Sequence, residues 1–284
     1  MTVTRSYTDD ERRHFLRFTR TQRWPMLERF PISDELHVEL LAEMLACSPA
    51  RIRAMLAALR DETRQTAARL LDDDRYRAAV ARLPFGPGDR VVAVGDSITA
   101  DRLGWFELLH ASIELIGGSS ATWCNLAVSG NTTADVIERF DLVEAARPSH
   151  VLLMLGTNDA RAHGRSASRR MITGAETERN IRTLVDLIGT DMRAALTVIT
   201  PPAVDQGRIT AHFAGHPVNW HAVTVEEVAA VVRKVVPHSL DLHAATSGPS
   251  SAGLLETDGV HLTTAGQQAI LGRIVDHLAG DPGE

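Results

Sequence analysis

The chain has few lysines and few cysteines, and both shortages narrow what it can be. Lys234 is its only lysine, although lysine and arginine together number 30; we ascribe this bias to the base composition of the genome rather than to function. Cys47 and Cys124 are the only cysteines, and neither has a second cysteine at metal-ligand spacing. This excludes a cysteine-based zinc site and argues against a structural disulfide.

Long apolar runs and an excess of positive charge are also missing. No stretch approaches the roughly 18 consecutive apolar residues that a membrane span requires, and the N-terminus has no apolar segment with positive flanks of the signal-peptide kind. We therefore expect a cytoplasmic protein. The net charge of -6 argues against a protein that coats nucleic acid or an anionic membrane.

From about residue 88 onward, short apolar runs alternate with helical patterns. Most of these runs have the near-continuous apolar character of strands that are covered on both faces. Such alternation is typical of βαβ units and a parallel sheet. The expected strands cover residues 91–94, 122–128, 151–155, 196–199 and 239–242, and the helices between them include 132–146, 176–188, 225–236 and 264–278.

Residues 1 to about 83 have a different pattern, with no strand signal and with arginines and carboxylates at helical spacing. Capping signals predict helix starts at Thr8, Ser33 and Ser48, the last followed by a proline at the first helical position. The sequence PFGPG at 84–88 then breaks the pattern. We predict a small all-α bundle over residues 1–83 and an α/β domain over residues 84–284.

Four short motifs follow the expected strands. They are GDSIT at 95–99, NLAVSGNT at 125–132, GTND at 156–159 and DGVHLT at 258–263. Open α/β sheets form their ligand crevice at the carboxyl ends of the strands. We therefore expect the polar side chains of these motifs to meet at one edge of the sheet.

The motifs contain the groups that serine-based ester hydrolysis needs. A serine hydroxyl such as that of Ser97 is a poor nucleophile at neutral pH, so a base must take its proton, and His261 titrates in the right range. Asp258 can hold that imidazole in the required tautomer and orientation. Negative charge on the former carbonyl oxygen needs preorganised donors; the candidates are the backbone N–H groups of Ser97 and Gly130 and the side-chain amide of Asn158.

In this order, the four motifs resemble the SGNH subgroup of the GDSL esterase and lipase superfamily. The resemblance covers roughly residues 88–280 and implies a three-layer, flavodoxin-like parallel sheet. It implies Ser97 as nucleophile and first oxyanion donor, Gly130 and Asn158 as further oxyanion donors, and Asp258 and His261 as the rest of the triad. Ala127 stands where the second motif of this subgroup often has a glycine, a departure that leaves Gly130 in place.

Residues beside these motifs are candidates for substrate binding. Arg161 and His163 leave the strand end next to Asn158, and an arginine there can hold a sugar hydroxyl or an anionic group. The other candidates are Asp96, Asp159 and His216.

A zinc interpretation of the histidines at 212, 216 and 221 is disfavoured. The required spacing needs a helix, and Gly215 and Pro217 interrupt it. Since the serine mechanism needs no metal, we expect neither a metal nor another cofactor.

The expected partner is a small-molecule ester. A short acyl group on a polar or sugar-like alcohol, as in an esterase or deacetylase, is favoured because the expected crevice loops are rich in arginine and histidine and poor in large apolar residues. Lysophospholipase, thioesterase and acyltransferase activities use the same triad and stay open as alternatives.

The N-terminal segment contains a stretch, residues 40–59, that resembles a helix-turn-helix. Against DNA binding, the usual turn glycine is absent, carboxylates offset the arginines, and helix packing explains the apolar positions. We expect these helices to pack on the hydrolase, to shape its mouth or to form a homodimer. The non-enzymatic alternative is a ligand-sensing module with a DNA-binding N-terminus; the complete set of catalytic groups argues against it.

Overall fold

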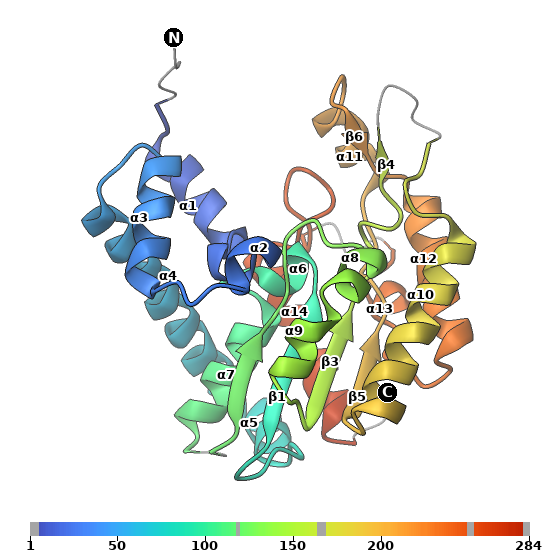
Figure 1. Ribbon diagram of the computed structural model, residues 1–284. Helices are drawn as coiled ribbons and strands as arrows, with labels where there is room; N and C mark the ends of the chain where they lie inside the picture. The colour runs from blue at the N-terminus through green and yellow to red at the C-terminus, as the bar shows by residue number, and fades with distance from the viewer. Residues whose placement is uncertain (1–5, 118–119, 164–168, 249–252, 281–284) are drawn as a thin grey trace.

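The centre of the molecule is a four-stranded parallel sheet in the order β2-β1-β3-β5. This computed structural model describes residues 6–117, 120–163, 169–248 and 253–280. Helices cover both faces of the sheet, which confirms the predicted three-layer α/β architecture (Figure 1). The strands are β1 (Arg90–Gly95), β2 (Thr122–Asn125), β3 (His150–Met154) and β5 (Ala195–Ile199).

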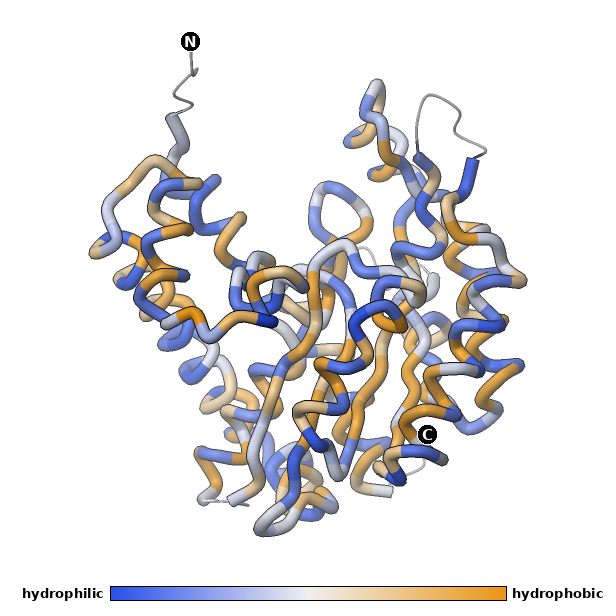
Figure 2. The backbone as a smooth tube through the Cα atoms, viewed as in Figure 1, coloured by the Kyte–Doolittle hydropathy of each residue, from blue (hydrophilic) through white to orange (hydrophobic). Residues whose placement is uncertain are grey.

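The side chains of β1 alternate between two hydrophobic cores. Val91 and Ala93 pack on one face of the sheet, and Val92 and Val94 pack on the other. Because both faces are buried, the strands read as continuous apolar runs, and they form the apolar centre of the tube in Figure 2. The first face is covered by α7 (Trp105–Leu115) and α14 (Thr264–Leu278), and the second by α8 (Thr133–Glu138), α9 (Phe140–Ala145), α10 (Gly174–Asp186) and α12 (Ala222–Val235).

Four expected elements differ from those observed. The strand expected at 122–128 ends at Asn125. The strand expected at 239–242 is only a bridge between Leu240 and Ile199, because Asp241 accepts a hydrogen bond from the Ala244 N–H and starts α13 (Leu242–Thr246). The helix expected at 132–146 breaks at Arg139, whose buried guanidinium donates to the Asn131 side chain and the Leu126 carbonyl. The helix expected at 176–188 continues as a π-helical turn, η2 (Leu187–Asp191).

The N-terminal region is helical, as the sequence predicts. All three predicted caps are confirmed: Thr8, Ser33 and Ser48 each accept a hydrogen bond from a backbone N–H in the first turn of the following helix. The elements are α1 (Asp9–Phe18), η1 (Thr21–Arg23), α2 (Pro25–Glu28), α3 (Asp34–Met44), α4 (Pro49–Leu70) and α5 (Asp74–Ala81).

Hydrophobic packing crosses the expected boundary between residues 83 and 84. Ala79 and Val80 of α5 belong to the core on the α7 face of the sheet, and Leu103, which precedes α7, belongs to the core of the N-terminal helices. The helical region is therefore packed directly on the α/β region.

An ion-pair network fixes α1 on the sheet region. Arg17 Nη2 lies 2.6 Å from Asp101 Oδ2, and Arg17 Nη1 lies 3.0 Å from Glu256 Oε1. The Asp101 side chain is fully buried, so removing its partner would leave an uncompensated charge at a cost of about 3–5 kcal/mol. This contact holds α1 in a defined position beside the carboxyl ends of the strands.

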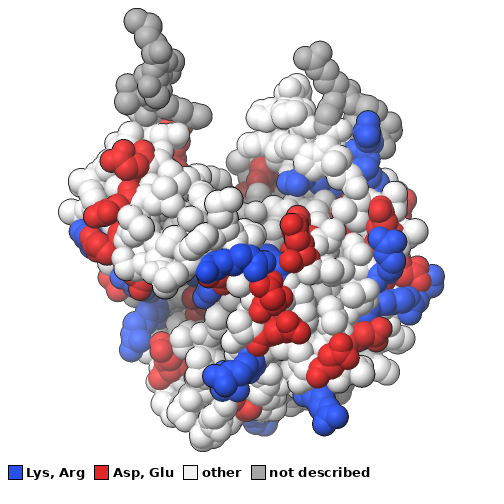
Figure 3. Space-filling model, in the orientation of Figure 1, with Lys and Arg blue, Asp and Glu red and all other residues white. Residues whose placement is uncertain are grey.

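A second projection lies across the same edge of the sheet. It contains the two-stranded antiparallel pair β4 (Ala162–His163) and β6 (Val218–Asn219) and the short helix α11 (Gln206–His212). Figure 3 shows that the molecule is hollowed between this projection and the N-terminal helices. Within the described ranges, no helix combines the length and apolar composition that crossing a membrane requires.

Candidate active site

Ser97 is the first residue of α6 (Ser97–Ala100), directly after β1. The strand turns sharply into the helix because Gly95 has no side chain: a Cβ there would lie 2.5 Å from Thr99 Oγ1 and 2.9 Å from the Met154 carbonyl oxygen. The buried Asp96 side chain caps α6 by accepting the Ile98 N–H at 3.0 Å. The turn places the Ser97 hydroxyl and its backbone N–H at the carboxyl end of the sheet.

Ser97, His261 and Asp258 form a hydrogen-bonded chain. Ser97 Oγ lies 2.9 Å from His261 Nε2, and His261 Nδ1 lies 2.6 Å from Asp258 Oδ2. The other carboxylate oxygen, Oδ1, accepts the backbone N–H groups of Val260 and His261, each at 2.9 Å. The compact turn between Asp258 and His261 has Gly259 at φ +74°, where a side chain would be strained. The structure thus brings together the three residues that the sequence singles out.

The expected oxyanion donors lie at the same place. Gly130 has φ +88°, a backbone conformation that favours glycine. The Asn158 amide donates one of its N–H groups to the Asn131 carbonyl at 3.1 Å, and an amide nitrogen has two. Ser97, Gly130 and Asn158 line one pocket together with His261.

This pocket has a volume of about 350 Å³, and residues of both the N-terminal helices and the α/β region form its walls. His14, Phe15 and Phe18 of α1 form one side, and Arg161 and Trp220 of the second projection form the other. Three large aromatic side chains line the pocket, and two of them, Phe15 and Phe18, come from α1 and not from the loops that the sequence analysis considered. The full lining is His14, Phe15, Phe18, Thr19, Ser97, Ser129, Gly130, Thr157, Asn158, Arg161, Trp220, Val260 and His261.

Phe18 of α1 also touches His261 and Ser129 directly. The ring centroids of Phe18 and His261 are 4.9 Å apart, and Ser129 Oγ donates to the Phe18 carbonyl. Nothing in the sequence of residues 1–83 identified these residues, because α1 carries no motif of its own. Their place in the pocket follows from tertiary packing, through the contacts of Arg17 with Asp101 and Glu256.

Comparison with known proteins identifies the family of the chain. The sequence profile of the GDSL-like lipase/acylhydrolase family matches residues 93–269, which include the serine turn and the Asp-x-x-His turn. The chain belongs to this family. It is therefore a hydrolase of the esterase and lipase kind.

Solved structures of family members and other esterases share the fold of this GDSL-like hydrolase. A lipase/acylhydrolase from Enterococcus faecalis matches 68% of this chain and 96% of its own, with 26% identity and a TM-score of 0.56. An acetyl xylan esterase from Geobacillus stearothermophilus matches 70% of this chain and 99% of its own, with 19% identity and a TM-score of 0.54. No curated protein matches the sequence.

Charge in the site of this GDSL-like hydrolase is arranged around His261. Burial of the imidazole opposes its protonation, but the hydrogen bond and charge of Asp258 outweigh this effect and raise the pKa of His261. Burial likewise opposes ionisation of Asp258, but the hydrogen bonds from His261 and the backbone lower the pKa of Asp258 well below its usual range. Asp258 is therefore ionised at neutral pH and is able to stabilise a protonated imidazole.

Asp96 and Asp159, which were candidates for substrate binding, are buried and do not line the pocket. Burial raises the pKa of Asp96 to about 6, although the Ile98 N–H favours its ionised form. Asp159 accepts hydrogen bonds from the Thr133 N–H, at 3.0 Å, and from the hydroxyls of Thr133 and Thr177. Both carboxyl groups thus order the backbone beneath the pocket.

The three remaining candidates lie in the second projection. Arg161 lines the pocket, whereas His163 and His216 do not. His163 Nε2 accepts a hydrogen bond from Arg161 Nε at 2.6 Å. His216 packs its ring on Phe213, with centroids 5.9 Å apart. Within the described ranges, no three histidine, cysteine, aspartate or glutamate side chains are grouped so as to hold a metal ion.

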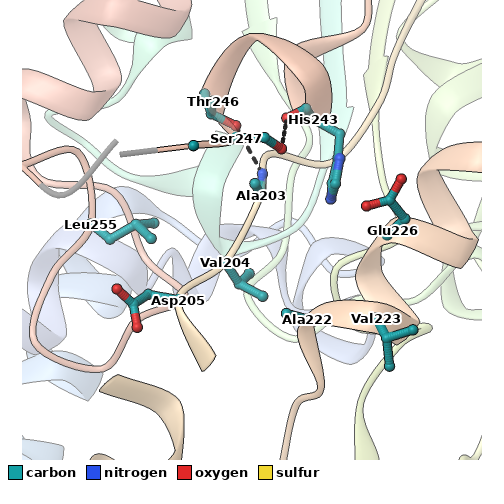
Figure 4. Close-up of a pocket in the computed structure, with 11 residues that line it drawn as sticks. Ala203, Val204, Asp205, Ala222, Val223, Glu226, His243, Thr246, Ser247 and Leu255 are labelled. Carbon is teal, nitrogen blue, oxygen red and sulfur yellow. Dashed lines mark hydrogen bonds between the residues drawn. The ribbon is translucent and has the colours of Figure 1, made fainter. Parts of the chain in front are cut away.

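A larger pocket of about 580 Å³ lies elsewhere, between α12 and α13 (Figure 4). Its wall includes Asp205, Glu226 and His243 but none of the triad residues. Several of its polar groups bind within the protein: Ser247 Oγ donates to the His243 carbonyl at 2.6 Å, and the Ala203 N–H donates to Thr246 Oγ1 at 2.8 Å. Among its described lining residues, no hydroxyl group is hydrogen-bonded to a histidine ring, unlike Ser97 in the smaller pocket.

Proposed function

We propose that this GDSL-like hydrolase is a serine esterase that cleaves carboxylic esters through an acyl-enzyme intermediate. The observation that carries the proposal is the hydrogen-bonded chain from Ser97 Oγ through His261 to Asp258, at 2.9 and 2.6 Å. A serine hydroxyl within hydrogen-bond reach of an imidazole that a carboxylate orients is the arrangement that nucleophilic acyl transfer needs.

In the proposed mechanism, Ser97 Oγ attacks the ester carbonyl carbon while His261 Nε2 takes its proton. The carbonyl oxygen becomes negative and receives hydrogen bonds from the backbone N–H groups of Ser97 and Gly130 and from the free N–H of Asn158. His261 then donates the proton to the departing alcohol, leaving the acyl group on Ser97. A water molecule, deprotonated by His261, attacks the acyl-enzyme and releases the acid.

The pocket favours a short acyl group. Its volume of about 350 Å³ lies near the lower end of small-molecule sites, roughly 300–1,000 Å³. Polar groups from Arg161 and Ser129 line part of it, which is compatible with a polar alcohol, as in an O-acetylated sugar or metabolite. Lysophospholipase, thioesterase and acyltransferase reactions would use the same three residues.

Initial rates with p-nitrophenyl esters from acetate to palmitate test this proposal. We expect turnover of the short esters with rates that fall as the chain lengthens. A fluorophosphonate probe should label one peptide, the one that contains Ser97, and mass spectrometry would locate the adduct. Labelling at another residue, or no ester turnover together with no labelling, would refute the proposal.

The pH dependence of kcat/KM should report the raised pKa of His261. The base acts only when its imidazole is neutral, so a raised pKa moves the loss of activity to a higher pH. We expect the acid limb to have its midpoint above the ordinary histidine value of 6.5, with activity rising as the pH increases through it. Rates measured with p-nitrophenyl acetate across the pH range check this, and a midpoint below 6.5 contradicts it.

Replacing Asn158 by alanine should reduce kcat without a matching rise in KM. The Asn158 amide would contact the ester carbonyl oxygen mainly once that oxygen becomes negative. Loss of the amide should therefore reduce kcat roughly 10²- to 10³-fold. Steady-state kinetics on p-nitrophenyl acetate would separate the two constants. A decrease of less than about threefold would remove Asn158 from the proposed oxyanion hole.

A further inference from the structure

Arg161 presents a half-buried guanidinium to the catalytic pocket. It lies on the loop that follows Asn158 and lines the pocket opposite α1. Its Nη1 atom is 4.0 Å from the position that a Cβ would occupy on Gly130, and its Cζ atom is 5.9 Å from the ring centroid of Trp220. A positive charge therefore lies next to one of the proposed oxyanion donors.

No carboxylate in the described part of the chain forms an ion pair with Arg161. Asp135 and Asp96 favour its charged form only through space, and burial outweighs them and lowers the pKa of Arg161. Two other arginines near this edge of the sheet are paired: Arg17 with Asp101 and Glu256, and Arg170 with Glu227 at 3.0 Å. A half-buried charge that has no carboxylate partner among the described residues is costly, and an anionic ligand would supply one.

The guanidinium is held in place for such a role. Arg161 Nε donates to His163 Nε2 at 2.6 Å. Burial and the charge of Arg161 lower the pKa of His163, so its imidazole is neutral at pH 7 and accepts this hydrogen bond. His163 is fixed in turn by the pairing of β4 with β6, opposite Val218. His163 is therefore a positioning residue.

The remaining N–H groups of Arg161 are suited to a carboxylate. A guanidinium has five N–H donors, and only the one on Nε is used in the contact with His163. The two terminal nitrogens form a planar fork that matches two oxygens of one carboxylate. Trp220, whose Nε1 donates to the Thr157 carbonyl at 2.9 Å, forms a fixed wall beside this fork.

We propose that Arg161 is a specificity-determining residue that binds a carboxylate on the ester substrate. The inference rests on the proposed esterase function, since it names the class of ester that the same pocket accepts. The carboxylate lies either on the acyl group, as in a half-ester of a short dicarboxylic acid, or on the alcohol, as in an acylated hydroxy acid. Either position brings a negative group into the pocket that Ser97 and Arg161 line.

Two pairs of esters, matched apart from charge, test the proposal. The acyl-side pair is p-nitrophenyl hemisuccinate and p-nitrophenyl butyrate; the alcohol-side pair is 4-acetoxybenzoate and its methyl ester. The readout is the ratio of kcat/KM for the anionic ester to that for the neutral one, after subtraction of the rate with Ser97→Ala protein. In the wild type we expect a ratio of about 10–100 for one pair, from a hydrogen-bonded charge pair.

Substitutions at two arginines then assign the preference. Arg161→Gln should bring the ratio to about 1, and Arg161→Lys should retain part of it, since the charge stays but the fork is lost. Arg170→Gln is the matched control, because Arg170 bridges to Ala162 in the same projection and already has Glu227 as a partner. It should keep the wild-type ratio. A purely structural role of Arg161 would lower both rates together and leave the ratio unchanged.

The failure of this inference differs from the failure of the esterase proposal. If the wild type hydrolyses the neutral esters with no preference for an anion, or if Arg161→Gln keeps the preference, the carboxylate site is refuted and the esterase stands. If no ester is hydrolysed, calorimetric binding of succinate and 4-hydroxybenzoate decides. Binding that Arg161→Gln weakens at least about tenfold supports the site, and equal or absent binding in both proteins overturns it.

Discussion

The Ser97→Ala variant should lose roughly 10⁵- to 10⁶-fold in kcat on short p-nitrophenyl esters. The hydroxyl is the only candidate nucleophile whose oxygen lies within hydrogen-bond distance of His261, at 2.9 Å, among the described residues. Without it, His261 has no serine hydroxyl to deprotonate, and only the oxyanion donors and the pocket walls can assist water. Initial rates at saturating p-nitrophenyl acetate, corrected for spontaneous hydrolysis, measure the loss.

Ser129→Ala is the matched control for this variant. Ser129 also lines the pocket, but its hydroxyl donates to the Phe18 carbonyl and not to His261. We expect less than about a tenfold loss, the equivalent of one ordinary hydrogen bond. Because both changes remove a single hydroxyl, thermal unfolding should show two folded proteins. A Ser97→Ala protein that keeps more than about a hundredth of wild-type kcat would exclude Ser97 as the nucleophile.

The sheet and the catalytic turns could be predicted because local sequence dictates them. Val91 to Val94 are apolar on both faces since helices cover both sides of β1. Gly95 is required because Thr99 and the Met154 carbonyl occupy the space of a side chain. Gly259 has a positive φ in the turn that joins Asp258 to His261. Each of these constraints restricts the type of residue at a position, and the sequence shows that residue directly.

The walls of the pocket could not be predicted in this way. Phe18 lies against His261 because residues distant from it in the chain hold α1 in place, as in the contacts of Arg17 with Asp101 and Glu256. Such contacts are made by ordinary helical residues, and no spacing marks them. The same holds for Trp220, which lines the pocket although no motif in the sequence marks it. The sequence therefore indicates the proposed reaction more closely than it indicates the substrate.

Polar side chains account for the misplaced element boundaries. Arg139 has only 1% of its surface exposed, and its guanidinium donates to the Asn131 side chain and the Leu126 carbonyl, which holds the residue where the expected helix breaks. Asp241 ends the fifth expected strand by capping α13. In both cases the hydrogen bonds of a polar side chain set the boundary of the element. Hydrophobic periodicity along the chain does not reveal such bonds.

The Asp258→Asn variant should lose about 10⁴-fold in kcat at neutral pH, although it changes a single atom. The backbone N–H groups of Val260 and His261 both donate to Oδ1. In an asparagine, that position must be the carbonyl oxygen, so the NH₂ group faces His261 Nδ1. Nδ1 then has to accept a hydrogen bond, which puts the ring proton on Nε2. An imidazole protonated at Nε2 cannot take the proton of Ser97.

This loss should appear in kcat rather than in folding. The side chain keeps its size and the two backbone hydrogen bonds, so near-UV circular dichroism should match the wild type. The raised pKa of His261 should also fall, because the carboxylate that outweighs burial is gone; NMR titration of the imidazole measures this directly. If Asp258→Asn retains more than about a tenth of wild-type kcat, Asp258 does not orient His261. The roles proposed for the Asp-x-x-His turn would then have to be assigned to other groups.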